Sequence, residues 1–379
     1  MEGQKKHHTL NIQQGIGQPS DTNKESIQQF RLKKKGLLSA DAYVEGIAAG
    51  NRTILGKAIT LVESSLPSHM ELSQEILEKC LPLSGNSIRI GITGIPGVGK
   101  STFIESLGTA LTGMNHKLAV LAIDPSSERS GGSILGDKTR MEKLSTDPLA
   151  FIRPSPSAGT LGGVARKTRE TIILCEAAGY DTLFVETIGV GQSETAVHSM
   201  VDFFLLLMLA GAGDELQGIK RGIMEMADAI AITKSDGNNL TKAATAKAEF
   251  ERALHLFPPK ESDWVPVVLT CSALNNEGIG DIWDAMVRYR EQTMTSGYFL
   301  RKRREQSRYW MHEAIHQHLQ DNFYHSSSIR KMMPVLEKKV QAGELTPFHS
   351  ARLMLEAYFK ERQIPDDNPA EPDGKAPSG

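Results

Sequence analysis

The sequence predicts an α/β fold in which a mostly parallel sheet is covered by helices and is flanked along the chain by helical segments. Between residues 87 and 295, short apolar runs alternate with amphipathic segments of helical length. The longest apolar run, residues 203–212, is too short to cross a bilayer as a helix and fits a central strand that is buried on both faces. On both sides of this block, apolar residues recur at helical spacing instead.

The segment before the sheet is expected to contain two parts. Residues 1–24 are rich in Gln, Asn, Lys and Gly and show no periodicity, so we expect them to be disordered. Residues 25–86 are predicted to form a helical N-terminal extension. Its helical spacing is carried by Leu37, Ala40, Val44 and Ile47, and later by Ile54, Ala58, Leu61 and Val62.

The central block, residues 87–295, is predicted to form one domain around the sheet. Strands are expected at residues 87–94, 117–124, 149–153, 181–186, 201–209, 229–234 and 265–271. Helices are expected at residues 100–112, 161–179, 239–257 and 279–294.

No strand pattern remains after residue 296. Residues 296–363 are predicted to form a helical arm, with helices at 298–323, 329–342 and 347–363. Pro334 is expected to interrupt the second of these helices, because proline removes a helical hydrogen bond. Residues 364–379 are rich in Pro, Asp and Gly, and we expect them to be disordered.

The composition indicates which partners and which cellular compartment to expect. A formal net charge of −2 gives no general reason to expect nucleic acid or an anionic membrane as partner. The three cysteines are far apart and form no CxxC pair, which fits a reducing cytoplasm better than a disulfide framework or zinc site. The polar N-terminus lacks the apolar stretch of a secretory signal. We therefore expect a cytoplasmic protein that does not span a membrane.

A glycine-rich segment, GIPGVGKST at residues 94–102, matches the full GxxxxGK[ST] motif. Glycines let the backbone curl so that its N–H groups point at phosphate oxygens, and the following helix directs its positive end at the same anion. Lys100 is expected to reach the β- and γ-phosphates, and the Ser101 hydroxyl to bind Mg²⁺. Chance would give about 0.02 such matches in a chain of this length. The binding residues expected here are Gly94, Gly97, Val98, Gly99, Lys100, Ser101 and Thr102.

Two segments at predicted strand ends indicate that the base is guanine. TKSD at residues 233–236 resembles the NKxD element, in which a carboxylate, here Asp236, accepts from guanine N1–H and N2–H; adenine offers neither donor. Thr233 stands where Asn is usual and lacks the amide that usually ties this strand to the P-loop and to purine N7, which leaves the affinity for guanine open and affects the choice of base less. CSA at residues 271–273 resembles the loop whose backbone contacts guanine O6. The predicted base-binding residues are Thr233, Lys234, Asp236, Ser272 and Ala273.

Acidic residues near the predicted phosphate site are candidate Mg²⁺ ligands, because this hard cation prefers oxygen. Asp124 and Glu186 end predicted strands at the carboxyl edge of the sheet, where parallel sheets bind ligands. Glu186 also begins ETIG, which resembles the DxxG switch with Glu in place of Asp, and Gly189 of this switch is a predicted nucleotide contact. Asp137 lies in a glycine-rich loop and is either a metal ligand or a solvated loop acid. The predicted metal ligands are Ser101, Asp124, Asp137 and Glu186.

Four long motifs together resemble the MeaB/ArgK family, the methylmalonyl-CoA mutase-associated GTPases that are similar to the methylmalonic aciduria type A protein. The motifs are GIPGVGKST, AIDPSSERSGGSILGDKTRM (residues 122–141), ETIGVGQSE (186–194) and AGAGDELQGIKRG (210–222), and the similarity extends over about residues 37–360. The resemblance implies a P-loop GTPase of the SIMIBI type that hydrolyses GTP to GDP with Mg²⁺. It also implies a homodimer whose contact is the C-terminal arm.

The same resemblance implies a partner, an adenosylcobalamin-dependent acyl-CoA mutase. Family members gate delivery of its cofactor and protect or reactivate it, and the mutase accelerates their slow intrinsic GTPase. Lys220 matches a family lysine implicated in mutase-stimulated hydrolysis. From spacing alone it is either a cation for the γ-phosphate or an exposed helix lysine. Gln192 is a second catalytic candidate, for positioning water, although it stands three residues past Gly189 and equally fits a structural hydrogen bond.

Three alternatives differ in client or chemistry. A nickel-inserting metallochaperone GTPase needs a cysteine or histidine cluster, and the chain has neither CxxC nor a His-rich tract. An ArgK-type transport-protein kinase predicts ATP use, against which Asp236 argues. The same GTPase acting on another B12-dependent acyl-CoA mutase is not separable from the methylmalonyl-CoA mutase hypothesis by sequence.

Overall fold

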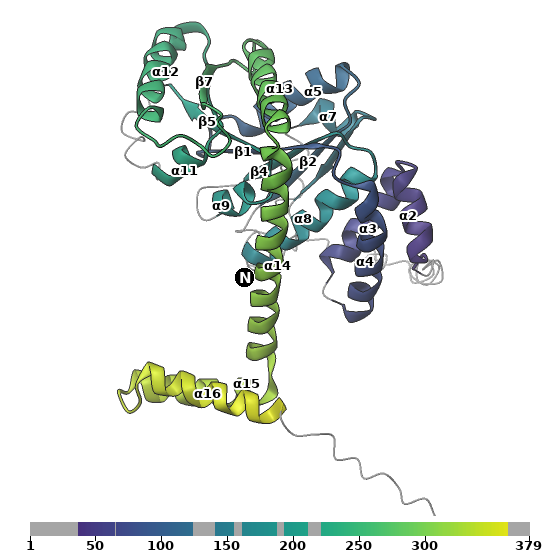
Figure 1. The fold of residues 1–379 in the computed structure, drawn as a ribbon, viewed down its shortest axis with the longest axis vertical. Coiled ribbons are helices and arrows are strands. Elements are labelled where there is room, and N and C mark those ends of the chain that lie inside the picture. Colours follow the sequence, from purple (N-terminus) through teal and green to yellow (C-terminus); the bar gives the residue numbers. More distant parts are fainter. Residues whose placement is uncertain are drawn as a thin grey trace, which may run out of the picture.

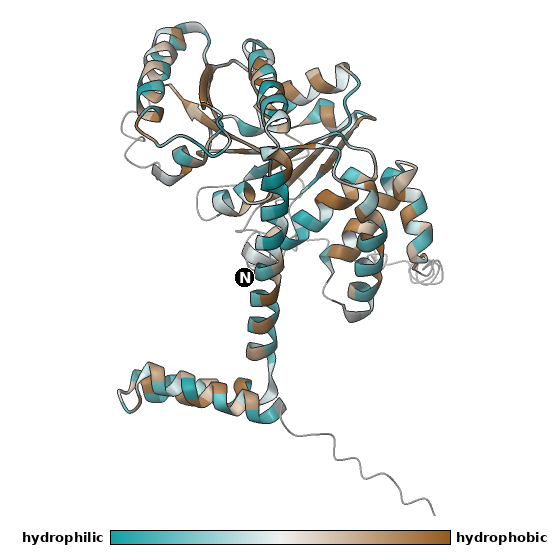
Figure 2. Cartoon of the chain, viewed as in Figure 1, coloured by the Kyte–Doolittle hydropathy of each residue, from teal (hydrophilic) through white to brown (hydrophobic). Residues whose placement is uncertain are grey.

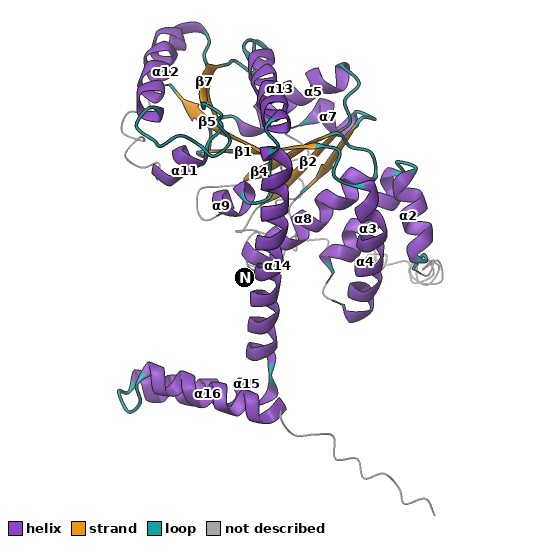
Figure 3. Cartoon of the chain, viewed as in Figure 1, coloured by secondary structure: helices purple, strands orange, loops and turns teal. Residues whose placement is uncertain are grey.

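A seven-stranded sheet lies at the centre of the computed structural model, with helices on both of its faces (Figures 1 and 3). The strands run in the order β3–β2–β4–β1–β5–β6–β7, and every neighbouring pair is parallel. The strands are β1 (Ile88–Gly94), β2 (Leu118–Ile123), β3 (Ala150–Arg153), β4 (Thr182–Thr187), β5 (Phe203–Leu209), β6 (Ala229–Thr233) and β7 (Val267–Thr270). The predicted α/β fold with its parallel sheet is therefore confirmed. The structure describes residues 37–64, 66–123, 141–154, 161–187, 193–210 and 221–362.

Alternate side chains of the strands pack into different layers, because successive residues of a strand point to opposite faces. Ile90 and Ile92 of β1 belong to one apolar cluster with helices α5, α7 and α13, whereas Leu183 and Val185 of β4 belong to another with α8 and α9. Strand β5 contributes to both layers and is buried over almost its whole length, as its uninterrupted apolar run predicts. These helices are α5 (Lys100–Gly113), α7 (Glu142–Thr146), α8 (Leu161–Ala177), α9 (Ser193–His198) and α13 (Ile279–Thr295).

Helices α11 (Arg221–Met226) and α12 (Leu240–Leu254) pack with strands β5 and β6 in a third apolar cluster, near the β7 end of the sheet. A short 3-10 turn at Gly237–Asn239 separates α12 from the end of β6. The segment that leads from the end of β5 into α11 lies outside the described residues.

Three helices precede the sheet and pack beside α8 (Figure 1). They are α2 (Ala40–Ala48), α3 (Arg52–Glu63) and α4 (Pro67–Cys80), followed by a 3-10 turn at Leu81–Leu83. Asn51 caps α3 by accepting hydrogen bonds from the backbone N–H groups of Thr53 and Ile54. The helices lie within the predicted extension, whose first part, residues 25–36, falls outside the described residues together with the predicted disordered residues 1–24.

The C-terminal helices extend away from the sheet. Helix α14 (Tyr298–His325) projects outward, and α15 (Ser327–Gln341) and α16 (Pro347–Arg362) pack against each other at its far end (Figure 1). The prediction that Pro334 interrupts the second helix is wrong, because α15 continues through it. Proline costs a helix one hydrogen bond, and the packing of α15 on α16 holds the helix together across this position. No helix in the described part of the chain is both long and apolar enough to cross a membrane.

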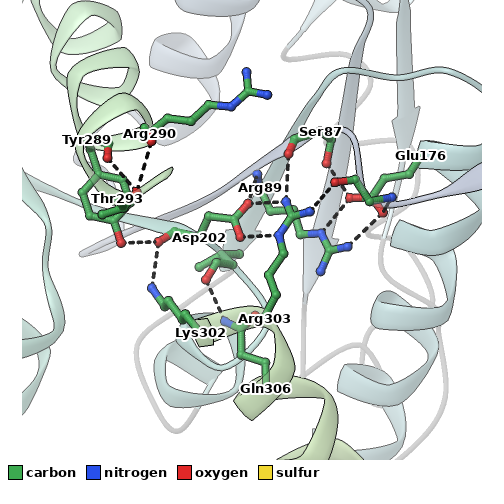
Figure 4. Close-up of polar contacts among 12 residues, drawn as sticks. Ser87, Arg89, Glu176, Asp202, Tyr289, Arg290, Thr293, Lys302, Arg303 and Gln306 are labelled. Carbon is green, nitrogen blue, oxygen red and sulfur yellow. Dashed lines mark hydrogen bonds and ion pairs between the residues drawn. The ribbon is translucent and has the colours of Figure 1, made fainter. Parts of the chain in front are cut away.

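A buried ion pair fixes the base of α14 to the sheet (Figure 4). Nε and Nη2 of Arg303 donate to the two carboxylate oxygens of Asp202 at 2.8 and 2.6 Å. The same guanidinium donates to the carbonyl oxygens of Gly85 and Ser87 at 2.6 and 2.8 Å. Asp202 also accepts from the backbone N–H of Arg89 at 2.8 Å, so the pair joins α14 to the starts of β1 and β5.

Further along α14, two side chains hold the segment that connects α9 to β5. The Gln306 amide donates to the carbonyl oxygen of Val201 at 2.8 Å, and the Trp310 indole donates to that of Ser199 at 3.0 Å. The first half of α14 is thus part of the packed structure, and its second half carries the α15–α16 pair.

Figure 2 shows that the strands are apolar and that the outer helices carry both apolar and polar residues.

Candidate nucleotide-binding site

The glycine-rich segment forms the connection between β1 and α5, at the carboxyl edge of the sheet. Gly97 and Gly99 have φ values of 79° and 99°, which L side chains rarely adopt. At Gly94, where φ is 154°, an added Cβ would lie 2.5 Å from the carbonyl oxygen of Leu207 on β5. The loop therefore needs glycine at the motif positions, and it leads directly into the N-terminus of α5, which suits phosphate binding.

The Lys100 side chain folds back over this loop. Its ammonium donates to the carbonyl oxygens of Gly94 at 2.7 Å and Ile95 at 3.3 Å. Burial lowers the pKa of Lys100, while the nearby carboxylates of Glu186 and Glu194 oppose that shift. A buried cation on a phosphate-binding loop, close to two carboxylates, is the arrangement expected where a polyanion and a divalent cation share a site.

One candidate metal ligand, Glu186, lies on β4 and acts electrostatically on Lys100 of this loop. Glu186, at the penultimate position of β4, is 4% exposed and is paired in register with Ile92 of β1 and with Ala122 of β2. The hydroxyls of Thr93 and Thr187 lie 2.9 Å apart and connect the ends of β1 and β4. Ser101 lies in the first turn of α5, beside Lys100.

Several predicted site residues lie outside the described residues. These are Asp124, Asp137, Gly189, Gln192 and Lys220. Strand β2 ends at Ile123, which is paired in register with Thr187 of β4. In the part of the chain that is described, no group of three or more His, Cys, Asp or Glu side chains is placed to hold a metal ion.

The end of β6 carries the predicted base-binding loop, and its first residue contacts the P-loop although it has no side-chain amide. Thr233 does tie this strand to the P-loop: its hydroxyl donates to the carbonyl oxygen of Val98 at 2.7 Å and also lies 3.2 Å from that of Met208. Lys234, with φ of 55°, donates to the carbonyl oxygen of Gly97 at 2.9 Å. Two consecutive side chains therefore fasten the loop after β6 to the phosphate loop, one of them without the usual amide.

Asp236 is held by the loop that follows β7. The Ser272 hydroxyl donates to its Oδ2 at 2.5 Å, and the backbone N–H of Asn275 donates to the Ser272 hydroxyl at 3.2 Å. An antiparallel bridge between Ser272 and Glu277 closes this loop, with backbone hydrogen bonds of 2.9 and 3.0 Å. The structure thus brings together the two predicted base-binding segments, with Ala273 following Ser272.

Glu194 is a neighbour of the site that the sequence interpretation did not single out. It lies in the first turn of α9, is 2% exposed, and acts electrostatically on Lys100. The sequence signal for it was its place as the last residue of ETIGVGQSE, the motif that begins with Glu186.

Comparisons with known proteins identify a matching family and several similar proteins. The family model described as methylmalonyl-CoA mutase-associated GTPase MeaB matches residues 55–328. A probable GTPase of Mycobacterium tuberculosis is 49% identical over 318 residues, which cover 84% of this chain and 95% of the relative. A mitochondrial methylmalonic aciduria type A homolog of Mus musculus is 48% identical over 337 residues, covering 86% of this chain and 81% of the relative.

A solved structure described as a LAO/AO transport system kinase is also similar. It matches with a TM-score of 0.69 and 38% identity, over 85% of this chain and 99% of the solved chain. The similarity extends beyond the phosphate-binding loop to most of the chain.

Proposed function

The chain belongs to the MeaB family of methylmalonyl-CoA mutase-associated GTPases, and from this premise we propose that it is a G-protein chaperone of a B12-dependent acyl-CoA mutase. In this proposal it hydrolyses GTP to GDP and phosphate, gates the loading of adenosylcobalamin, and protects or reactivates methylmalonyl-CoA mutase. Its turnover is slow when it is alone and is stimulated by this client.

The observation that carries the GTPase part of the proposal is the convergence of three loops on one edge of the sheet. The phosphate loop after β1 is fastened to the loop after β6 through Thr233 and Lys234, and that loop is fastened to the one after β7 through Asp236 and Ser272. Such a chain of contacts sets the distance between the phosphate-binding and base-binding groups. It therefore supports recognition of a whole nucleotide at this edge.

The side chains present fit GTP with Mg²⁺. The amides of the glycine-rich loop and the ammonium of Lys100 suit a triphosphate, and the Ser101 hydroxyl with the buried Glu186 carboxylate supplies oxygen donors for the metal. Bound Mg²⁺ would neutralise charge on the phosphates. Asp124 and Asp137 are proposed as further ligands, and Gly189 as a nucleotide contact. The Asp236 carboxylate, oriented by Ser272, would accept from guanine N1–H and N2–H, which favours GTP over ATP.

Catalysis in this site would consist mainly of positioning and electrostatic stabilisation. The Lys100 ammonium now donates to the backbone carbonyl oxygens of Gly94 and Ile95. Once it has turned away from them, it would stabilise negative charge on the oxygens of the transferred phosphoryl group. We propose Lys220 as a second cation that acts in the presence of the client, and Gln192 as a group that orients water. Neither side chain lies in the described part of the chain.

The α15–α16 pair is proposed as the homodimer contact. Apolar side chains remain exposed on these two helices although they pack together, and Phe348 is 89% exposed. Exposed residues of this kind are Val335, Phe348, Leu355 and Phe359. Apolar groups gathered at the end of a projecting helix mark an interaction surface, and a second copy of the chain would cover them.

The test is GTP turnover by the purified protein, alone and with an adenosylcobalamin-dependent methylmalonyl-CoA mutase, with Lys100→Ala as the inactive control. We expect slow basal turnover that rises at least about tenfold with the mutase, well below the effect of an arginine finger in trans. If the turnover rate is unchanged by this mutase but rises with another B12-dependent acyl-CoA mutase, that second mutase is the client. Preference for ATP, with phosphate transferred to a protein, would favour the transport-protein kinase instead.

A further inference from the structure

A cavity of about 420 Å³ lies between the N-terminal extension, the sheet-covering helix α8 and the base of the arm. Its wall is formed by residues that share one face of each helix, with spacings of three or four residues along α8 and α14. It contains no residue of the glycine-rich loop or of the loops after β6 and β7. It is thus separate from the nucleotide site, and its volume falls in the range of small-molecule pockets.

One cation on this wall forms no direct salt bridge with the described residues, although the Glu170 carboxylate acts on it electrostatically. The guanidinium of Arg169 lies 5.4 Å from the ring centre of Trp310, and in the described part of the chain it makes no hydrogen bond or ion pair. The other charged groups of the wall have partners. Arg166 pairs with Glu170 at 3.3 Å, and Glu313 lies 3.7 Å from His316.

The surroundings of Arg169 are unfavourable for a cation. Burial and, to a smaller extent, the nearby positive charge of Arg89 lower the pKa of Arg169 to about 10, and the Glu170 carboxylate opposes this shift. Glu176 does not relieve this, because its carboxylate is used by Arg89 at 2.8 Å and by the Ser87 hydroxyl (Figure 4). A guanidinium retained there without an acceptor leaves up to five N–H donors for a ligand.

The rest of the wall combines apolar side chains with the polar side chains of Ser73, Gln74, Ser307 and Gln317. Val62 and Met70 come from the extension, Ile173 from α8, and Met311 and Ala314 from α14. Trp310 supports one face of the guanidinium, so the edge of its planar fork remains for contact with a planar or tetrahedral anion.

We propose that this cavity binds a small organic anion, a carboxylate or a phosphate monoester carried on an apolar group. The anionic head would accept hydrogen bonds from Arg169, in the geometry that guanidinium offers to carboxylate and phosphate. The apolar group would fill the space between the methionine, valine and isoleucine side chains. Because the wall comes from α3, α4, α8 and α14, the ligand would link the extension and the arm through α8, a role independent of the proposed function.

Binding is tested on the full-length protein by titration calorimetry with three probes that share one chain: octanoate, octyl phosphate and octanol. Excess GDP and Mg²⁺ keep octyl phosphate away from the glycine-rich loop. We expect at least one anionic probe to bind about tenfold or more tightly than octanol, the ratio that one charge-assisted hydrogen bond gives. The preferred probe identifies the head group as carboxylate or phosphate. Equal affinities for the three probes, or no binding of the anions, would overturn the proposal.

Variants locate the site. Arg169→Gln should remove the preference for the anion, whereas Arg166→Gln, one helical turn away and already paired with Glu170, should keep it. The anion should also change tryptophan fluorescence in the wild type and not in Trp310→Phe. A preference that survives in Arg169→Gln would place the binding elsewhere and contradict the proposal. Unfolding of each variant in urea, which we expect to match the wild type for Arg169→Gln, shows whether the fold is intact.

Discussion

The hydroxyl of Thr233 donates to the carbonyl oxygen of Val98 at 2.7 Å, which joins the end of β6 to the glycine-rich loop. This contact is buried, since Thr233 is 4% exposed. It takes the place of the side-chain amide that usually makes the connection, and so the departure from Asn leaves the two loops joined. Three loops from separate parts of the chain form one continuous edge through contacts of this kind.

Replacement of Thr233 by valine should weaken this edge. The variant keeps the shape of the side chain but leaves the Val98 carbonyl without its donor, which costs about 1–3 kcal/mol of stability. We also expect GTP affinity to fall, because the loop that carries Asp236 is then less well positioned. Urea unfolding and calorimetry measure the two effects. Thr241→Val, at an exposed position of α12, is the control, and the same GTP affinity in both variants would contradict the linking role.

Lys100→Ala should abolish tight GTP binding. The ammonium is the only side-chain cation that the motif supplies to the β- and γ-phosphates, and charge-assisted hydrogen bonds contribute about 1.5–3 kcal/mol each. We expect an affinity loss of at least about a hundredfold, measured by calorimetry with GTP and Mg²⁺. Lys143→Ala, on the exposed surface of α7, should bind as the wild type does. Unchanged affinity in Lys100→Ala would rule out the assignment of the phosphate site.

Asp236→Asn should move the base preference from guanine toward xanthine. The amide still accepts from Ser272 through its oxygen, and its NH₂ group can donate to the additional carbonyl of xanthine. We expect the ratio of GDP to xanthosine diphosphate affinity to change by at least about tenfold, as measured in competition titrations. A variant that retains the wild-type ratio would show that Asp236 does not read the base.

Arg303→Met should destabilise the fold and loosen the base of α14. Removal of the guanidinium leaves the Asp202 carboxylate buried and unpaired, which typically costs about 3–5 kcal/mol. Burial alone would raise the pKa of Asp202, but Arg303 holds it below the usual 3.8, so this stabilisation is present above that pH and is lost as the pH falls below it. Arg304→Met, at an exposed neighbouring position, should stay within about 0.5 kcal/mol of the wild type in urea unfolding.

Local patterns in the sequence predicted most of the fold. The apolar run at residues 203–209 predicted a buried strand, and β5 is buried there. The glycine spacing at residues 94–99 predicted a tightly curled loop, and the glycines there have positive φ values. The Asp202–Arg303 pair follows no such pattern, because its members are 101 residues apart and each alone resembles a surface charge.

For the candidate site, the sequence could predict the motif residues but not the contacts between the loops that carry them. Motif residues such as Lys100 and Asp236 could be named because phosphate and base chemistry demand particular groups. The contact of Thr233 with Val98 could not be predicted from the sequence, since it depends on how closely β6 approaches the glycine-rich loop. Likewise, the continuity of α15 through Pro334 depends on its packing against α16, which a local helix rule does not include.

The last prediction concerns acid stability and His198. The ring of His198 packs edge-on against Phe204 at 5.5 Å, and burial, with a smaller effect of the Lys302 charge, lowers its pKa from 6.5 to about 4. Asp228 raises the pKa slightly and Lys260 lowers it, so burial decides the direction. The folded protein therefore resists protonation of this ring, and an unfolded chain accepts the proton first.

Stability should accordingly fall as the pH is lowered from 6.5 toward 4, by about 1.4 kcal/mol for each unit between the folded and unfolded pKa values. His198→Phe lacks the titrating ring, so the stability of the wild type relative to this variant should decline over that pH range and level off below it. Urea unfolding at half-unit pH steps measures the difference, with His312→Phe, at an exposed position of α14, as the control. A difference between wild type and His198→Phe that is independent of pH would mean that the ring is protonated as easily in the folded protein as in the unfolded chain.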